Sequence, residues 1–232
     1  IPVMTSSTPL IELRSLVRSG ALGGVVLMDV AYGDEREAML LEEKIPTVLI
    51  GSSGCTVGAP GVDTDFAQMA HEAVKHLAGL GHRRIVALMR ETSADDAHAR
   101  QDQAQELLRA AVDLGVDVLV RQVPELALAG SAIVGADGLV EGRSAVVSNN
   151  PAALVGLACA AQAYGLSIPA DLSVLALGVT EYRGRQGEAF SELSVDREAM
   201  GAEAGSLLLR RLSGEPDPAQ RRRLMPALLT DR

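Results

Sequence analysis

Aromatic residues and cysteine are nearly missing from this chain. Its 232 residues include no tryptophan, three tyrosines, two phenylalanines and two cysteines, Cys55 and Cys159. A hydrophobic core must therefore be built from aliphatic side chains. Two cysteines are too few for the disulfide framework of a small secreted domain, and they fit a reducing compartment such as the cytoplasm.

Long apolar runs and clustered basic residues are missing too. No run of 18 or more apolar residues occurs, so no membrane-spanning helix is expected. The first ten residues lack the charged and apolar regions of a signal peptide. With 30 acidic against 21 basic residues the net charge is −9, and phosphate backbones are bound by clustered Lys and Arg. Any DNA binding must therefore depend on another part of the protein.

Short apolar runs alternate with helical patterns along most of the chain. Continuous runs are typical of strands buried on both faces of a parallel sheet, and here they predict strands at Ile1–Thr5, Gly24–Met28, Thr47–Gly51, Arg84–Met89, Asp117–Gln122, Ala145–Asn149 and Ser173–Leu177. The predicted helices are Pro9–Ser19, Asp34–Lys44, Asp65–Leu80, Ala97–Leu114, Pro151–Tyr164 and Arg197–Ser213. This alternation predicts an α/β fold, and the number of units favours two doubly wound parallel-sheet lobes with a cleft between them.

Three positions are expected to carry the chain between the lobes: Val62–Asp65, Ser194–Asp196 and the proline-rich stretch Glu215–Ala219. With these crossovers, residues 1–63 and 195–216 are predicted to form an N-terminal lobe. Residues 64–194 and 217–232 then form a C-terminal lobe. Pro151 suits the first position of a helix, with a polar cap before it at Asn150.

Two stretches resemble one known family. His71–Met89 reads "HEAVKHLAGLGHRRIVALM", and Ala145–Gly178 reads "AVVSNNPAALVGLACAAQAYGLSIPADLSVLALG". Both are similar to the effector-binding region of lactose/galactose-repressor-type (LacI/GalR) transcriptional regulators. The resemblance continues in the family's order from Gly20 to the end of the chain, and it implies the periplasmic-binding-protein type I fold.

The resemblance also implies a function and partners. The chain is expected to be the effector-binding and dimerisation domain of a bacterial LacI-family regulator. In that family a small molecule in the interlobe cleft controls operator binding by a homodimer. The family's N-terminal helix-turn-helix is absent from this chain, as is its first strand–helix unit, because Ile1–Thr5 resembles the second strand. The alternative is a periplasmic solute-binding receptor of the same fold, with an export signal upstream.

Ligands of open α/β sheets bind beyond the carboxyl ends of the strands, where helix N-termini converge. The residues that follow the predicted strands, together with Phe66 at the first crossover, are therefore candidates to line the cleft: Asp29, Gly51, Ser52, Phe66, Arg90, Asn149, Gly178 and Tyr182. The few aromatic residues near the cleft mouth, Tyr32, Tyr182 and Phe190, can face the ligand or pack against loops.

The family's pattern can be carried over at a few positions. Asn149 resembles the asparagine that hydrogen-bonds the effector, although it can equally be a mere cap of the following helix. Gln103 stands where the family usually has an arginine clamp, and Arg100 lies one turn earlier. Gly51 and Gly178 stand where sugar-responsive members carry acidic residues. The expected effector is a sugar-like or other small polar molecule, a less polar one, or none.

The remaining motifs do not indicate catalysis. His71 and His76 are five residues apart on one helix, which is the wrong spacing for a shared metal, and His82 reads as a turn residue. Cys55 has no histidine placed by the sequence to activate it. Phosphate-binding loops and nucleophile elbows do not occur in the expected contexts. We therefore expect no cofactor, no metal and no enzymatic activity.

Overall fold

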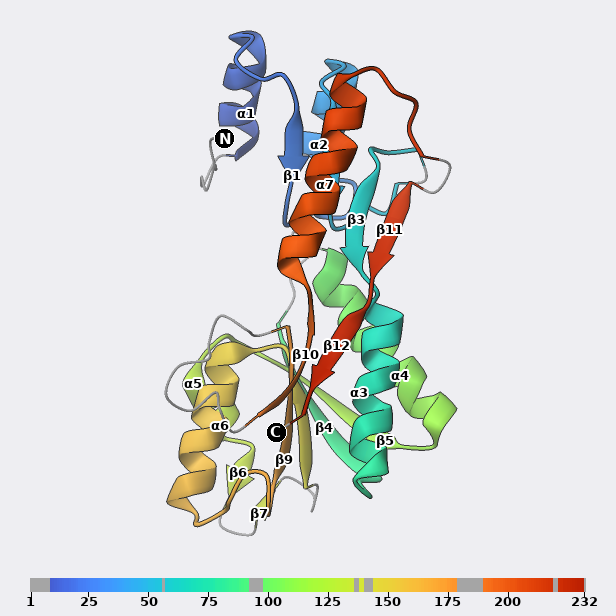
Figure 1. Cartoon of the computed structure of the whole chain (residues 1–232). Helices are drawn as coiled ribbons and strands as arrows, with labels where there is room; N and C mark the ends of the chain where they lie inside the picture. The colour runs from blue at the N-terminus through green and yellow to red at the C-terminus, as the bar shows by residue number, and fades with distance from the viewer. Residues whose placement is uncertain are drawn as a thin grey trace. The chain divides into compact units, whose positions relative to one another are not determined.

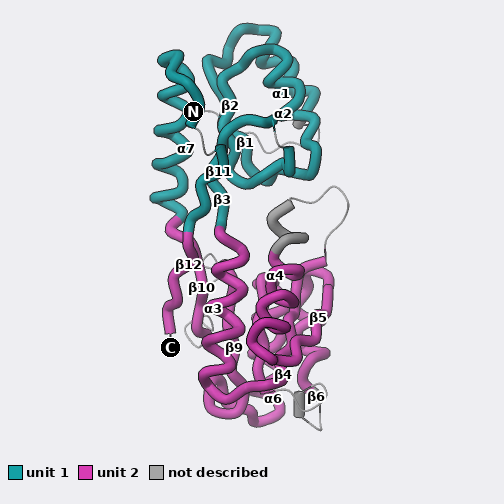
Figure 2. Tube along the Cα trace, turned by 90° about the vertical axis from the view of Figure 1, so that its right-hand side faces the viewer, with its two compact units in different colours: residues 1–64, 95–99, 197–225 teal, residues 65–94, 100–196, 226–232 magenta. Residues whose placement is uncertain are grey.

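The structure is a computed structural model that describes residues 9–55, 57–91, 98–135, 138–139, 144–178, 190–218 and 221–231. Figure 2 shows the chain divided into two compact units. Unit 1 comprises Ile1–Thr64, Asp95–Ala99 and Arg197–Met225. Unit 2 comprises Asp65–Ala94, Arg100–Asp196 and Pro226–Arg232. Each unit has a sheet of mainly parallel strands with helices packed on it, which confirms the predicted two-lobed α/β fold.

Unit 1 contains a four-stranded parallel sheet in the order β1-β2-β3-β11. Its strands are β1 (Val25–Leu27), β2 (Thr47–Ile50), β3 (Gly61–Thr64) and β11 (Arg222–Met225), and its helices are α1 (Pro9–Arg18), α2 (Glu35–Glu42) and α7 (Arg197–Leu212). One cluster of buried side chains joins α1 and α2 to the sheet through Leu13, Leu40 and Leu49. Strand side chains alternate between the two faces of a sheet. The fully buried Val48 therefore lies on the face opposite to Leu49, where α7 packs.

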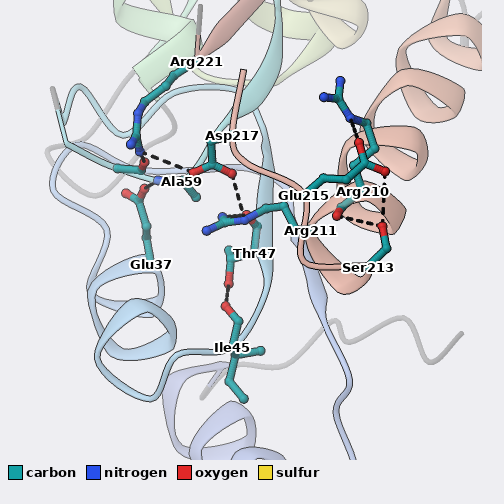
Figure 3. Close-up of polar contacts among 11 residues, drawn as sticks. Glu37, Ile45, Thr47, Ala59, Arg210, Arg211, Ser213, Glu215, Asp217 and Arg221 are labelled. Atoms are coloured by element: carbon teal, nitrogen blue, oxygen red, sulfur yellow. Dashed lines mark hydrogen bonds and ion pairs between the residues drawn. The ribbon is translucent and has the colours of Figure 1, made fainter. Parts of the chain in front are cut away.

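The segment that follows α7 is bound to unit 1 by charged side chains (Figure 3). Asp217 lies 3.2 Å from Arg211 and 3.8 Å from Arg221. Arg211 donates to the carbonyl oxygen of Thr47 and Arg221 to that of Gly58. The chain therefore stays with the sheet of unit 1 beyond the end of α7.

This arrangement corrects one predicted boundary. The sequence predicts that residues 217–232 belong to the C-terminal lobe, but the chain remains in unit 1 through Met225. The reason is that β11 pairs with β3, and Arg222 forms an ion pair with the buried carboxylate of Asp63. The passage to unit 2 comes at Pro226.

Unit 2 is built on a six-stranded sheet in the order β12-β10-β9-β8-β4-β5. The strands are β4 (Arg84–Arg90), β5 (Asp117–Val123), β8 (Ala145–Ser148), β9 (Ser173–Leu177), β10 (Ser191–Val195) and β12 (Ala227–Thr230). All neighbours are parallel except β12, which is antiparallel to β10. A separate short hairpin joins β6 (Val134–Gly135) to β7 (Gly138–Leu139).

Helices cover both faces of this sheet (Figure 1). They are α3 (Phe66–Gly79) and α4 (His98–Leu114) on one face, and α5 (Ala127–Ser131) and α6 (Pro151–Ala163) on the other. In β4, Ile85, Ala87 and Met89 pack toward α3 and α4, whereas Val86 and Leu88 pack toward α6. Both faces are therefore apolar, as the continuous apolar runs predict.

Helices α5 and α6 touch at two glycines. A β-carbon added to Gly156 would lie 1.7 Å from the carbonyl oxygen of Ala127, and one added to Gly130 would lie 1.7 Å from that of Ala153. Real β-carbons do not approach oxygen so closely. The two helix backbones are therefore in direct contact, and neither glycine can carry a side chain without moving a helix.

Most predicted elements form, with differences of one or two residues at their ends. The predicted strand Ile1–Thr5 lies outside the described residues. The chain passes from unit 1 to unit 2 between Thr64 and Asp65 and back between Asp196 and Arg197. These points lie at or beside the predicted crossovers Val62–Asp65 and Ser194–Asp196, whose first residues end strands β3 and β10. Within the described residues, no helix has the length and apolar character needed to cross a membrane.

Candidate ligand-binding site

Three predicted ligand-binding residues come together in unit 2. Arg90 ends β4, Asn149 directly follows β8, and these two strands are parallel neighbours. Their carboxyl ends therefore lie at the same edge of the sheet. Gln103, in the early turns of α4, reaches the same place and contacts Asn149.

Asn149 and Gln103 form an amide pair whose orientation is determined by the backbone. The backbone N–H of Arg90 donates to Oδ1 of Asn149 at 2.8 Å, and an N–H group can only donate. The other end of the Asn149 amide is therefore Nδ2, which donates to Oε1 of Gln103 at 2.6 Å. Nε2 of Gln103 then faces the thioether sulfur of Met69 at 3.5 Å. Both amide side chains are only partly buried.

Asn150, the next residue, has a purely structural position. It is fully buried, and its Oδ1 accepts from the backbone N–H of Ala153 at 3.1 Å, which caps α6. Its Nδ2 donates to the carbonyl oxygens of Val123 and Pro124 at 3.3 and 3.1 Å. The cap of α6 is therefore Asn150, as predicted, and the capping alternative for Asn149 is wrong.

The side chain of Arg90 adds a charged group near this edge. Its Nη2 lies 3.1 Å from Oε1 of Glu125, which follows β5. Its Nε is buried and has no hydrogen-bond partner within the described structure. Glu125 follows β5 and so fits the rule that ligand-binding residues follow strands, although it is not among the predicted residues.

Two more predicted residues of unit 2 contribute no polar side chain. Gly178 follows β9 with a φ of +65°, and its N–H donates to the carbonyl oxygen of Leu193 at 2.8 Å. Phe66 begins α3 and packs against the core on the α3 and α4 face. Phe190 is expected either to face the ligand or to pack against other parts of the chain. It is buried in the core beneath α6, so packing is its role.

The three candidates of unit 1 follow β1 and β2. Asp29 is exposed with a φ of +48°, and Arg36 donates to its carbonyl oxygen at 2.9 Å. Gly51 has a φ of +113° and donates to the carbonyl oxygen of Val62 at 2.9 Å. The hydroxyl of Ser52 accepts from the N–H of Gly54 at 3.2 Å.

The loop that carries Asp29 is stabilised by a partly buried ion pair. Arg36 lies 2.7 Å from the carboxylate of Asp34, which caps α2. Burial raises the pKa of Asp34, but the hydrogen bonds from Arg36 and from the Ala31 and Arg36 backbone outweigh burial and lower it overall. Asp34 is therefore an ionised anchor of this loop.

Other predictions fall outside the site or outside the described residues. Tyr182 is not among the described residues, and the side chain of Arg100 is not described either. Tyr32 is largely exposed and lies against Gly54 of unit 1. Both cysteines are exposed and outside any disulfide, and in the described part of the chain no cluster of His, Cys, Asp and Glu is suited to hold a metal.

His82 lies at the opposite, amino-terminal end of the unit 2 strands. Its Nδ1 is 3.0 Å from the hydroxyl of Ser144 and its Nε2 is 2.9 Å from that of Ser173, the residues at the starts of β8 and β9. Burial lowers the pKa of His82. His82 thus links two strands, which is a structural role more specific than that of a turn residue.

Comparison with known proteins identifies the family. The model of the periplasmic binding protein-like domain matches residues 74–232. An uncharacterised HTH-type transcriptional regulator of Streptomyces limosus is 29% identical over 173 residues, which cover 71% of this chain and 49% of that protein. The HTH-type transcriptional regulator MalR of Streptomyces coelicolor is 23% identical, covering 98% of this chain and 70% of that protein. The chain thus spans about half the length of the first relative.

A solved structure agrees with these relatives. The crystal structure of a LacI-family regulatory protein from Chloroflexus aggregans superposes with a TM-score of 0.84 at 25% identity, over all of this chain and 83% of that one. The matched family model covers more than half of the present chain. The chain therefore belongs to the periplasmic binding protein-like domain family, and within it to the regulatory domains of LacI-type transcriptional regulators.

Proposed function

We propose that this chain is the effector-binding and dimerisation part of a bacterial, cytoplasmic LacI-type transcriptional regulator. The observation that carries the proposal is the amide pair Asn149–Gln103 at the adjoining ends of β4 and β8. The two amides are polar groups able to bind a ligand, and they lie at the kind of strand edge where α/β sheets bind ligands. The membership of the chain in this family supports the same proposal. The whole protein would bind operator DNA as a homodimer through a helix-turn-helix outside this chain.

The proposed mechanism is a shift between two arrangements of the lobes. A small polar molecule in the expected interlobe cleft binds one arrangement better than the other and so changes their populations. The DNA-binding heads of a dimer must match two half-sites at a fixed spacing, so a change of arrangement changes operator affinity. A coupling of about 1–3 kcal/mol is typical of such systems.

The residues of unit 2 have defined parts in this mechanism. The Arg90 backbone holds Asn149, Asn149 holds Gln103, and the Gln103 amide presents N–H groups to the ligand. Asn150 fixes the start of α6, so the position of Asn149 does not depend on the ligand. Such preorganisation lowers the cost of ordering side chains on binding.

A thermal-shift screen of the 232-residue chain against sugars, nucleosides and small organic acids tests the proposal. A ligand at about 100 times its Kd stabilises the folded state by about 2.7 kcal/mol. Asn149→Ala should remove the shift that the best ligand gives to the wild type. The control Gln105→Ala, at an exposed amide two residues from Gln103 on α4, should retain it. A screen without any binder, or a shift that Asn149→Ala leaves intact, would contradict the proposal.

The alternative, a periplasmic solute receptor, differs in what is encoded before Ile1. An export signal there would favour the receptor, and a helix-turn-helix would favour the regulator. The similarity to HTH-type regulators of two Streptomyces species supports the regulator.

A further inference from the structure

Two of the passages that lead from unit 1 to unit 2 are neighbours. They lie between Thr64 and Asp65 and between Met225 and Pro226. Before the passages, β3 and β11 are parallel partners in which Met225 pairs with Thr64. Behind them the chain forms α3 and β12, and α3 packs against β12. The two passages are therefore held together within unit 1 and again within unit 2.

Gln68, in the first turn of α3, binds the residues behind both passages. Its backbone N–H donates to Oδ1 of Asp65 at 2.9 Å. Its side-chain Oε1 accepts from the backbone N–H of Ala227 at 2.9 Å, and its Nε2 donates to the carbonyl oxygen of Ala227 at 3.2 Å. An N–H only donates and a carbonyl only accepts, so this amide has one possible orientation.

The side chain of Gln68 takes the place of a neighbouring strand at Ala227. In an antiparallel pair, residues alternate between those that bond their partner strand and those that do not. Both backbone groups of Ala227 bind Gln68, so they point away from β10, although Ala227 lies opposite Val195. The hydrogen bonds from β12 to β10 therefore begin at Leu228, and the buried backbone of Ala227 is held by Gln68.

Only one residue, Pro226, lies between the fixed parts of the second passage. Met225 pairs with β3 on one side, and Ala227 is bound by Gln68 on the other. The proline ring fixes φ near −65°, and a residue that precedes proline is restricted to extended conformations. Without the two side-chain bonds of Gln68, Ala227 would join Pro226 as an unbound residue of this passage.

From these contacts we propose that Gln68 joins the two passages into one stiff hinge and so limits the arrangements that the two units can adopt. The inference goes beyond the proposed function, because it concerns the chain itself and requires no effector. Its consequence for the proposed mechanism is that a ligand chooses among few arrangements.

The two cysteines of the chain allow a direct test. Cys55 belongs to unit 1 and Cys159 to unit 2, and both are exposed. Nitroxide labels on these thiols report the distribution of distances between the units by double electron–electron resonance. An excess of unlabelled chain ensures that the measured distances lie within one molecule.

Gln68→Met should broaden that distribution. Methionine has a similar length and helix propensity, but it forms neither of the two bonds to Ala227. Gln105→Met makes the same exchange at an exposed position of α4 and should leave the distribution as in the wild type.

Amide hydrogen exchange followed by NMR distinguishes a hinge from mere stabilisation of β12. In Gln68→Met the N–H of Ala227 should exchange about tenfold faster than in the wild type. Faster exchange together with an unchanged distance distribution would mean that Gln68 only stabilises the edge of unit 2, and would overturn the proposal. Unchanged exchange would overturn it as well, because the bonds to Ala227 would then not hold that residue.

Pro226→Gly tests the same hinge without altering Gln68. Pro226 is exposed and has no N–H to lose, so this variant keeps the proposal testable if Gln68→Met does not fold. It should broaden the distance distribution, and a distribution equal to that of the wild type would refute the stiff hinge. A thermal-shift screen without any binder contradicts the proposed function and leaves this inference standing.

Discussion

Replacing Gly156 by alanine should destabilise unit 2 even though alanine is the better helix former. The added β-carbon would lie 1.7 Å from the carbonyl oxygen of Ala127 and 2.5 Å from its carbonyl carbon. Both neighbours are backbone atoms of α5, so no side-chain rotation can relieve the clash. One helix must move by more than 1 Å relative to the other, because an ordinary contact needs about 3.5 Å.

The magnitude follows from two opposing terms. Exchange of glycine for alanine inside a helix contributes about 0.5–1 kcal/mol of stability. Overpacking of a close contact costs about 1–3 kcal/mol, and more where the backbone must move. Because the clash is with backbone, we expect a net loss of about 2 kcal/mol. This corresponds to a decrease in melting temperature of roughly 4–8 °C for a unit of this size.

Urea and thermal unfolding followed by far-ultraviolet circular dichroism measure this loss. Gly201→Ala is the matched control, because Gly201 lies in the exposed part of α7 and an added β-carbon has no neighbour within 4 Å. That variant should be as stable as the wild type or slightly more stable. Equal stability of Gly156→Ala and the wild type would refute the backbone contact between α5 and α6.

Two other substitutions test the strand ends of unit 2. Burial lowers the pKa of His82 from its ordinary value of 6.5, so the neutral imidazole is favoured in the folded state. The contribution of His82 to the free energy of unfolding is therefore complete above about pH 6.5. It is lost as the pH falls through the lowered pKa. His82→Gln should therefore flatten the decrease in melting temperature between pH 7 and 5, and an unchanged pH profile would contradict this assignment. Asn150→Ala should cost about 1–3 kcal/mol by loss of the cap and two buried hydrogen bonds. Asn150→Asp keeps only the cap and should be nearly as destabilised, so a fully stable aspartate variant in urea titrations would argue against the bonds to Val123 and Pro124.

The elements that the sequence predicts well are those with a local physical signal. Ser173–Leu177 forms β9 over the predicted residues, because a continuous aliphatic run suits a strand buried on both faces. The start of α6 follows equally from Asn150 and Pro151, a cap and a first-turn proline next to each other.

Elements that depend on distant partners are predicted poorly. No strand is predicted at Gly61–Thr64, yet this segment forms β3 between β2 and β11, directly before the chain passes to unit 2. Its buried Asp63 is compensated by Arg222, which is 159 residues away. Helix α5 has only five residues, and it packs on α6 through Gly130 and Gly156. No local pattern in the sequence indicates that these two glycines lie close together.

For the site, strand ends and family resemblance place Asn149 and Gln103 among the candidates, but not in contact. Their hydrogen bond follows from the parallel pairing of β4 with β8 and from the packing of α4 beside them. The different positions of Asn149 and Asn150 likewise appear only when α6 and the end of β5 are in place.

The sequence by itself thus determined the α/β class, most of the helices and strands, and the strand-end residues that are candidates for a ligand site. The reason is that aliphatic runs, helix caps and helix-ending turns act over a few residues. Only the tertiary structure decided where β11 pairs, and that the Gln103 amide ends a directed series of hydrogen bonds. Those features depend on groups 46 to 159 residues apart in the chain, whose approach is determined by the packing of the whole unit.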